Sequence, residues 1–172
     1  PVADALVPQF AAACVSYLAM SDGPRPLRLL FVCTGNLCRS PMAAGIARHV
    51  AAEKGMSVEV RSCGTIARPG SPASENGVTA CAEKGVDISD HASHPLDRDL
   101  VEWADQILCM EERHLLAANA QAWRAPFKTW SLATSVNRKA LDDPYRKSMR
   151  NYRKPRDILW KAVDAALDKL VV

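Results

Sequence analysis

The sequence lacks the features that mark membrane-spanning, secreted and metal-binding proteins. No apolar run is long enough to cross a bilayer, and Asp4, Pro8 and Gln9 interrupt a first stretch of twenty residues that has no basic leader region. The six cysteines are scattered, with no C-x-x-C pair and no Cys/His cluster at zinc spacing. We therefore expect a cytoplasmic protein with no membrane insertion, no disulfide framework, no metal and no cofactor.

The sequence also lacks a strong charge of either sign and has few aromatic residues. The formal net charge is +3 and aromatic residues make up 6% of the chain, so the basic stripe interleaved with aromatics that is typical of nucleic-acid binding is missing. Lysine and arginine are nonetheless concentrated between residues 138 and 161. A solvated helix face is the simpler interpretation of this stretch, and a positive rim that attracts an acidic, phosphorylated substrate is the alternative. We expect no nucleic-acid partner.

The length of 172 residues is sufficient for one domain with its own hydrophobic core. Apolar runs predict strands at 27–32, 58–62, 106–110 and 127–132. Helical periodicity and turn residues predict helices at 8–20, 41–54, 75–84, 95–104, 112–120 and about 158–170. Residues 1–26 would form an N-terminal extension, made of a short helix and a linker, before a single domain over 27–172. Strands that alternate with helices predict a three-layer α/β fold, in which helices flank a four-stranded, parallel, twisted sheet.

The most informative motif lies between the first predicted strand and the helix that follows it. It is Cys33-Thr-Gly-Asn-Leu-Cys-Arg-Ser-Pro41. Backbone N–H groups of such a turn converge on a nest that binds anions, and the helix N-terminus adds positive potential. Gly35 and Asn36 are residue types that accept the positive φ that such a turn usually needs. An inert anion-binding turn is the alternative interpretation, but the whole motif between a strand and a helix is far more specific than a bare cysteine–arginine pair.

The residue types in this turn predict a covalent reaction with phosphate. Arg39 can fold back over the turn and hold two phosphate oxygens in its planar fork. Cys33 is predicted to be a thiolate at neutral pH that attacks phosphorus, while the turn's amides and Arg39 stabilise the equatorial oxygens. Ser40 is placed to donate a hydrogen bond to the sulfur and so to help it leave. The turn therefore predicts hydrolysis through a cysteinyl-phosphate.

At these residues the chain resembles the low-molecular-weight protein tyrosine phosphatases of bacterial type, from about residue 27 to the C-terminus. The resemblance implies a phosphotyrosine protein phosphatase I-like fold, with Cys33 as nucleophile and Arg39 as phosphate ligand. It also covers a second motif, Asp142-Asp143-Pro144-Tyr145, in which Asp143 would protonate the leaving phenolate and then activate water. For this dipeptide alone, an Asp-Pro turn that caps a loop is the alternative.

The resemblance also implies supporting and substrate-binding residues. Ser62 and His91 match residues that brace the turn through Asn36, and Cys38 matches a cysteine that can form a reversible disulfide with the nucleophile. Tyr145 would form one aromatic wall of the substrate slot. The residues expected to bind phosphate or substrate are Thr34, Gly35, Asn36, Leu37, Cys38, Ser40 and Tyr145.

Several positions depart from the family pattern. Cys63 stands where alanine or glycine is usual, and His94 replaces an arginine. The loop after Gly64 lacks the aromatic residue that lines the slot in many eukaryotic members. This absence is similar to bacterial members associated with exopolysaccharide operons, which oppose autophosphorylating tyrosine kinases. We therefore expect a phosphotyrosine-containing protein as partner, with such a kinase as one candidate, and a monomer or weak dimer.

Three other functions remain open at this stage. Relatives that hydrolyse phosphoarginine carry a threonine directly before the second cysteine of the turn, where Leu37 here favours a phenyl ring over a guanidinium group, as does Tyr145. Arsenate reductases need closely spaced resolving cysteines, and Cys81 and Cys109 lie far apart in the sequence. A non-catalytic phosphoprotein-binding module would keep the turn and Arg39 but would need neither a nucleophile nor a general acid.

Overall fold

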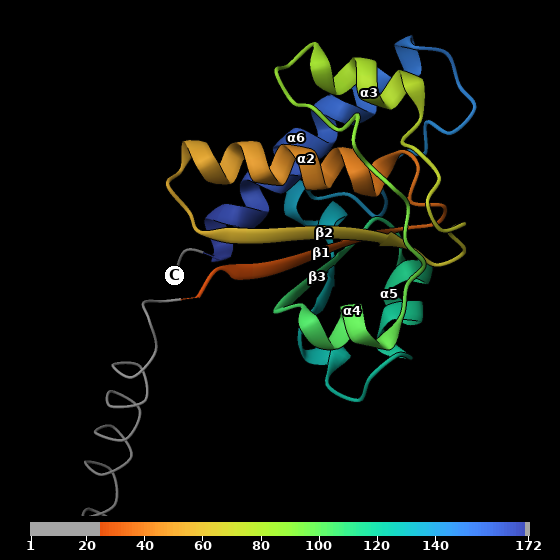
Figure 1. The fold of residues 1–172 in the computed structure, drawn as a ribbon. Helices are drawn as coiled ribbons and strands as arrows, with labels where there is room; N and C mark the ends of the chain where they lie inside the picture. The colour runs from red at the N-terminus through yellow and green to blue at the C-terminus, as the bar shows by residue number, and fades with distance from the viewer. Residues whose placement is uncertain (1–24, 171–172) are drawn as a thin grey trace, which may run out of the picture.

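The structure is a computed structural model and describes residues 25–170. Its sheet consists of β1 (Leu27–Cys33), β2 (Val58–Gly64), β3 (Gln106–Cys109) and β4 (Thr129–Ser131). All neighbouring strands are parallel, in the order β2-β1-β3-β4, and helices cover both faces (Figure 1). The predicted three-layer α/β fold is therefore confirmed, whereas the helix predicted at 8–20 lies outside the described residues.

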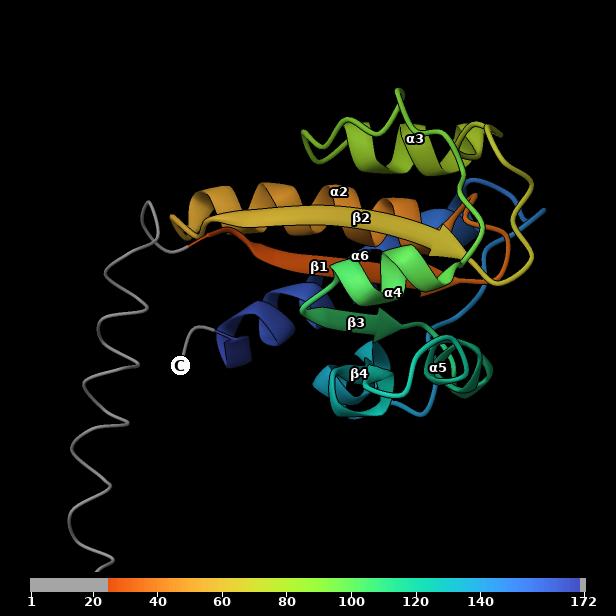
Figure 2. The ribbon, with the colours of Figure 1, turned by 60° about the horizontal axis from the view of Figure 1, so that its bottom comes forward.

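The middle strand β1 is buried on both faces, as its continuous apolar run requires. Leu29 and Phe31 face the larger core, which they share with α2 (Arg39–Glu53) and α6 (Arg150–Leu170). Leu30 and Val32 face a smaller core under α4 (Arg98–Trp103). Figure 2 shows this division, with α2 and α3 (Glu75–Ala82) on one side of the sheet and α4 and α5 (Glu112–Asn119) on the other. Among residues 25–170, no helix combines the length and the apolar character needed to cross a bilayer.

The carboxyl ends of the three longest strands meet at one edge of the sheet. Cys33 at the end of β1 pairs with Gly64 of β2, and Val32 pairs with Cys109 of β3. The chain leaves β1 for β2 on one side and later passes to β3 on the other, so the strand order reverses at β1. Open α/β sheets bind their ligands at such a switch point. The fold therefore places the cysteine turn where a ligand site is expected.

Helix α6 begins at Arg150, eight residues before the predicted start. It contains Pro155, a residue that normally weakens a helix interior. Tertiary packing outweighs this local preference, because Tyr152 and Arg156 are buried in the early turns and the Arg156 guanidinium donates to the Ala80 carbonyl at 2.7 Å. The local sequence could not reveal these partners.

Helix α4 and strand β4 are shorter than predicted. Pro95 lies in an extended bridge with Gly64, and Asp97 caps α4 by accepting a hydrogen bond from the Leu100 amide at 2.8 Å, so the helix begins at Arg98 rather than at residue 95. Strand β4 keeps only three residues of the predicted 127–132, because 3₁₀ turns lie on both sides of it (Ala125–Phe127 and Leu132–Val136). The other helices and strands predicted within residues 25–170 are confirmed to within two residues at each end.

Candidate active site

A cavity of about 310 Å³ opens at the carboxyl end of β1. Its wall consists of the turn between β1 and α2, the loop after β2, the start of α5 and the segment before α6. The lining residues are Cys33, Thr34, Gly35, Leu37, Cys38, Arg39, Ile66, Arg68, Ser71, Arg113, Asp143 and Tyr145. The fold thus brings Asp143 and Tyr145 to the cysteine turn from far along the chain.

Cys33 is almost fully buried at the end of β1, and its sulfur has two polar neighbours. The Asn36 amide donates to the sulfur at 3.2 Å, and the Ser40 hydroxyl oxygen lies 3.0 Å from it. Helix α2 begins at Arg39 with Cys38 as its N-cap, and no side chain caps its first amides. Uncapped N–H groups at a helix N-terminus favour a negative charge in front of them. The arrangement therefore favours a bound anion such as phosphate at this point.

The predicted contact between Ser40 and the Cys33 sulfur is present. Asn36 Nδ2 donates to the Ser40 oxygen at 2.8 Å, so the one proton of Ser40 is free to go elsewhere. Two acceptors lie within reach, the Cys33 sulfur and the Cys63 carbonyl oxygen at 3.2 Å. A thiolate at Cys33 would attract that proton, because hydrogen bonds to charged acceptors are the stronger ones.

Asn36 forms the hydrogen bonds that connect the turn to Ser62 and His91, as the resemblance implied. It is fully buried with φ of 55°, and its side-chain nitrogen Nδ2 also donates to the Ser62 hydroxyl at 2.9 Å. Its side-chain oxygen accepts from the His94 backbone amide at 2.8 Å, and its own carbonyl lies 2.8 Å from His91 Nε2. Burial lowers the pKa of His91, so the ring is neutral at pH 7 and its Nε2 donates to the carbonyl. At His94 it is the backbone, not the side chain, that supports the turn.

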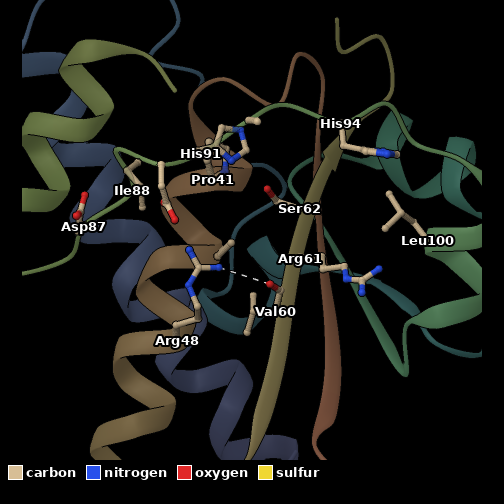
Figure 3. Close-up of a pocket in the computed structure, with 13 residues that line it drawn as sticks. Pro41, Arg48, Val60, Arg61, Ser62, Asp87, Ile88, His91, His94 and Leu100 are labelled. Carbon is tan, nitrogen blue, oxygen red and sulfur yellow. Dashed lines mark hydrogen bonds between the residues drawn. The ribbon is translucent and has the colours of Figure 1, made fainter. Parts of the chain in front are cut away.

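Behind Asn36 and its partners Ser62 and His91 lies a second, larger cavity of about 580 Å³ (Figure 3). Ser62 and His91 belong to its wall, together with Arg48 of α2 and Ile88. It reaches none of the residues from 33 to 40. This cavity is therefore the back of the turn and not the site of the reaction.

The glycine that the turn requires is Gly64 rather than Gly35. Of the two residues that could accept a positive φ in the turn, only Asn36 has one, and a Cβ on Gly35 would make only ordinary contacts at 3.7 Å. A Cβ on Gly64, at the end of β2, would lie 2.5 Å from the Thr34 carbonyl oxygen and 2.7 Å from the Asn36 amide nitrogen. Close approach of the second strand to the turn explains this glycine, and the local pattern of the turn could not reveal it.

The Arg39 guanidinium is buried among three acceptors. It donates to the Glu111 carboxylate, to the Leu141 carbonyl at 3.1 Å and to Asp143 Oδ2 at 2.5 Å. Burial alone would raise the pKa of Glu111, but the hydrogen bonds and charges of Arg39 and Arg113 outweigh it and hold the pKa below its usual range. Sequence reasoning missed Glu111, although its position soon after β3, at the same sheet edge as Cys33, was a usable signal.

Three apolar side chains line the outer cavity. Tyr145 is 48% exposed and lines the cavity as predicted, and its amide donates to Asp143 Oδ1 at 3.0 Å. Ile66, 75% exposed on the loop after β2, also lines the cavity and was not predicted. Leu37 contributes a third apolar surface. Asp142, the neighbour of Asp143, is exposed and is not among the lining residues.

His114 is a further buried residue that sequence reasoning missed. It lies on α5, and its Nε2 is 2.9 Å from the Thr34 hydroxyl. Burial and the nearby charge of Arg39 lower the pKa of His114 to about 4, so the ring is neutral at pH 7. It holds the Thr34 side chain through a contact between α5 and the turn, which are far apart in the sequence.

Cys38 lines the same cavity as Cys33, but its surroundings are different. Its sulfur is 3.3 Å from the Tyr152 hydroxyl of α6, and burial raises the pKa of the Cys38 thiol above its usual value. The pKa of Tyr152 is also raised, to about 12. Cys63, one of the departures from the family pattern, is buried in the smaller core on the α4 side of the sheet. The five cysteines within residues 25–170 are free thiols.

Comparison with known proteins agrees with this geometry. Residues 28–171 match the family described as low molecular weight phosphotyrosine protein phosphatase. The chain is 38% identical over 133 residues to a protein-arginine-phosphatase of Bacillus subtilis, and the matched region covers 76% of this chain and 88% of that protein. It is 35% identical over 147 residues to the probable low molecular weight protein-tyrosine-phosphatase EpsP of Ralstonia solanacearum, and the matched region covers 83% of this chain and 94% of that protein. A solved structure of a YwlE mutant from Bacillus subtilis is similar with a TM-score of 0.79 at 34% identity, over 84% of this chain and 98% of the other. The chain therefore belongs to the low molecular weight phosphotyrosine protein phosphatase family and is a phosphatase.

Proposed function

We propose that this phosphatase hydrolyses phosphotyrosine in proteins through a cysteinyl-phosphate on Cys33. The observation that carries the proposal is that Cys33, Arg39 and Asp143 line one cavity. They supply a nucleophile, a cation and a proton donor, the three groups that the reaction needs. A non-catalytic binding module would have no use for the first and the last of these.

The reaction proceeds in two displacements. In the first, the Cys33 thiolate attacks phosphorus, the bond between phosphorus and the tyrosine oxygen breaks, and protonated Asp143 gives its proton to the departing phenolate. In the second, Asp143 takes a proton from water, the water oxygen attacks phosphorus, and the sulfur leaves as a thiolate. Arg39 and the amides of the turn stabilise the phosphate oxygens in both steps, and Ser40 donates to the leaving sulfur.

Asp143 has to change partners during this cycle. Its Oδ2 lies 2.5 Å from a nitrogen of Arg39 that a phosphate oxygen would also use. A dianionic phosphate repels the carboxylate and competes for that nitrogen, which favours protonation of Asp143 and its movement toward the leaving oxygen. Glu111 keeps the guanidinium in place meanwhile, because it contacts a different nitrogen of Arg39.

Phosphotyrosine fits the outer cavity better than phosphoarginine does. Leu37, Ile66 and Tyr145 offer apolar surface to a phenyl ring. A substrate guanidinium group would need a carboxylate, and Asp143, the one carboxylate among residues 25–170 that lines the cavity, is needed as the proton donor. The cations Arg68 and Arg113 at the mouth would repel it further. The protein-arginine-phosphatase relative makes phosphoarginine the second candidate, since identities of 38% and 35% do not separate the two specificities.

The experiment compares kcat/KM for a phosphotyrosine peptide and a phosphoarginine peptide of the same sequence. Wild type should cleave the phosphotyrosine peptide faster. Cys33→Ser should lose turnover of both, and Asp143→Ala should lower kcat for the phosphotyrosine peptide by about 10²–10⁴. Asp142→Ala is the matched control and should stay near wild type, because its side chain does not line the cavity. Faster cleavage of phosphoarginine overturns the substrate, and turnover by Cys33→Ser overturns the mechanism.

The proposed partner is a tyrosine-phosphorylated protein, with an autophosphorylating tyrosine kinase as the first candidate. Its support is the similarity to EpsP and the absence of an aromatic residue from the loop after β2. The test is dephosphorylation of a purified, autophosphorylated bacterial tyrosine kinase, followed with an antibody to phosphotyrosine. Loss of the signal with wild type but not with Cys33→Ser supports the proposal, and an unchanged signal contradicts it.

A further inference from the structure

Exposed arginine side chains surround the mouth of the active-site cavity. Arg68 and Arg113 both line it and are both exposed, with 61% of the Arg113 side chain open to solvent. A third guanidinium group, that of Arg146, lies 5.3 Å from the ring centre of Tyr145. The positive rim considered for the basic stretch at 138–161 therefore exists, but two of its three members come from elsewhere in the chain.

The carboxylates near these cations do not neutralise them. Asp143 is held by Arg39. Glu111 is shared between Arg39 and Arg113, so it satisfies Arg113 only in part. Arg68 has no ion-pair partner within residues 25–170. The mouth thus retains positive charge that a negatively charged ligand can use.

The two lining cations stand on opposite sides of the nucleophile. Arg68 belongs to the loop that follows β2, and Arg113 belongs to the first turn of α5, which follows β3. Strands β2 and β3 flank β1, whose last residue is Cys33. An extended chain that crosses the mouth with its phosphorylated side chain in the cavity therefore passes one cation before that residue and the other after it.

We propose that this mouth is an interaction surface for acidic segments of the phosphoprotein substrate, with Arg68 and Arg113 each meeting a Glu or Asp on a different side of the phosphorylated residue. The inference rests on the proposed function, since it assumes a phosphotyrosine side chain in the cavity. Exposed ion pairs contribute modestly, so each should raise kcat/KM by about 1.5- to 5-fold. The effect should also weaken as salt is added.

The test uses phosphotyrosine peptides of one length with Glu, Gln or Lys next to the phosphotyrosine, on its N-terminal side only or on its C-terminal side only. For each enzyme variant, kcat/KM is divided by the value for p-nitrophenyl phosphate, which has no flanking residues, so that any general loss of activity cancels. Wild type should cleave Glu peptides faster than Gln peptides and Gln peptides faster than Lys peptides. High salt should bring the three rates together.

The variants assign the two sides. Arg68→Gln should lower the Glu-to-Gln ratio by about 1.5- to 5-fold for one set of peptides, and Arg113→Gln should do so for the other set. Arg124→Gln, an exposed arginine that stacks on Trp123 and does not line the cavity, is the matched control and should keep both ratios. Equal rates on Glu and Lys peptides overturn the inference, as do wild-type ratios in both variants.

These outcomes are distinct from failure of the proposed function. Equal cleavage of all phosphotyrosine peptides contradicts the acidic preference and leaves the tyrosine phosphatase intact. Cleavage of phosphoarginine peptides alone contradicts the proposed function. The same Glu, Gln and Lys series is then measured on phosphoarginine, where equal rates overturn the acidic mouth and a Glu preference supports it.

Discussion

The inner and outer parts of the cavity are built from different kinds of structure. The inner part is the 33–40 turn, most of which is buried. Hydrogen bonds join it to three other segments of the chain, at Ser62, His91 and His114. The outer part consists of Ile66, Arg68, Arg113 and Tyr145, all of them exposed on loops or at the start of a helix. A buried network has one arrangement and a high cost of disruption, whereas exposed side chains adapt at little cost.

This difference separates two tasks. In the proposed function the inner part holds the atoms that react, so substitutions there should lower kcat or the free energy of unfolding. The outer part contacts what is attached to the phosphate, so substitutions there should change the ratio of kcat/KM between substrates.

The largest effect is expected at Arg39. Arg39→Lys keeps the charge but loses the planar fork that reaches two carboxylates and would hold two phosphate oxygens. We expect kcat for p-nitrophenyl phosphate to fall by about 10²–10³. Arg48→Lys, an exposed arginine on the same helix, is the control and should change kcat little. Similar small losses in both variants would show that the fork does not act on the reacting phosphate.

The next effect is on stability, at Asn36. Asn36→Ala leaves the Ser62 hydroxyl and the His94 amide without their partner in a buried site, so we expect the free energy of unfolding to fall by about 3 kcal/mol. Asn137 has almost the same φ, 54°, but is exposed, so Asn137→Ala should cost only about 1 kcal/mol for the backbone conformation. Urea denaturation measures both. Equal losses of unfolding free energy would mean that the side-chain hydrogen bonds of Asn36 add nothing beyond the backbone conformation.

The buried His114 predicts a pH dependence of stability. Its pKa is lowered to about 4 in the folded protein, and the unfolded chain titrates near 6.5. As the pH falls from about 6.5 to 4, the unfolded state takes up a proton that the folded state resists, so stability is lost in this window and is unaffected above it. The loss due to this residue is at most about 3 kcal/mol.

His114→Asn removes the titrating group and keeps a side chain that can bond to Thr34. Its free energy of unfolding should therefore fall less steeply than that of wild type between about pH 6.5 and pH 4. His91 also has a lowered pKa and is present in both proteins, so its contribution cancels in the difference. Parallel stability curves for the two proteins would contradict the buried, neutral His114.

The smallest effect is expected at the outer walls. Tyr145→Ala should lower kcat/KM for a phosphotyrosine peptide by about 2- to 10-fold, the range of one aromatic contact, mostly through KM. Trp123 is 74% exposed and does not line the cavity, so Trp123→Ala is the matched control. A loss at Tyr145 as large as that at Arg39 would contradict the division between inner and outer parts.

The sequence predicts the inner part well because its geometry is mostly local. Cys33, Asn36, Arg39 and Ser40 belong to one turn between a strand and a helix, and the strand runs that place the turn are continuous and apolar. The expected partner of the turn, Ser62, was found by resemblance, since nothing in its own neighbourhood marks it. Local pattern and family resemblance together therefore recover the centre of the site.

The remaining residues depend on packing that no short stretch encodes. Glu111 and His114 reach the turn because β3 lies beside β1, and Gly64 is required by the distance between two strands. The early start of α6 depends on Tyr152, whose hydroxyl meets Cys38 across the core. Such contacts require the strand order and the helix placement to be known first, which is why the sequence alone did not reveal them.

In the proposed mechanism phosphate passes through Cys33, and capture of this intermediate is the sharpest experiment. Asp143→Ala, mixed with p-nitrophenyl phosphate and quenched rapidly in acid, should accumulate enzyme with one added phosphoryl group, because this good leaving group departs without an acid while attack by water is slowed. Peptide mapping by mass spectrometry should place the group on Cys33 rather than on the nearby Cys38, and Cys33→Ala should carry none. A cysteinyl-phosphate on Cys33 is contradicted if the enzyme turns over without ever carrying a phosphoryl group. It is also contradicted if the phosphoryl group lies on another residue.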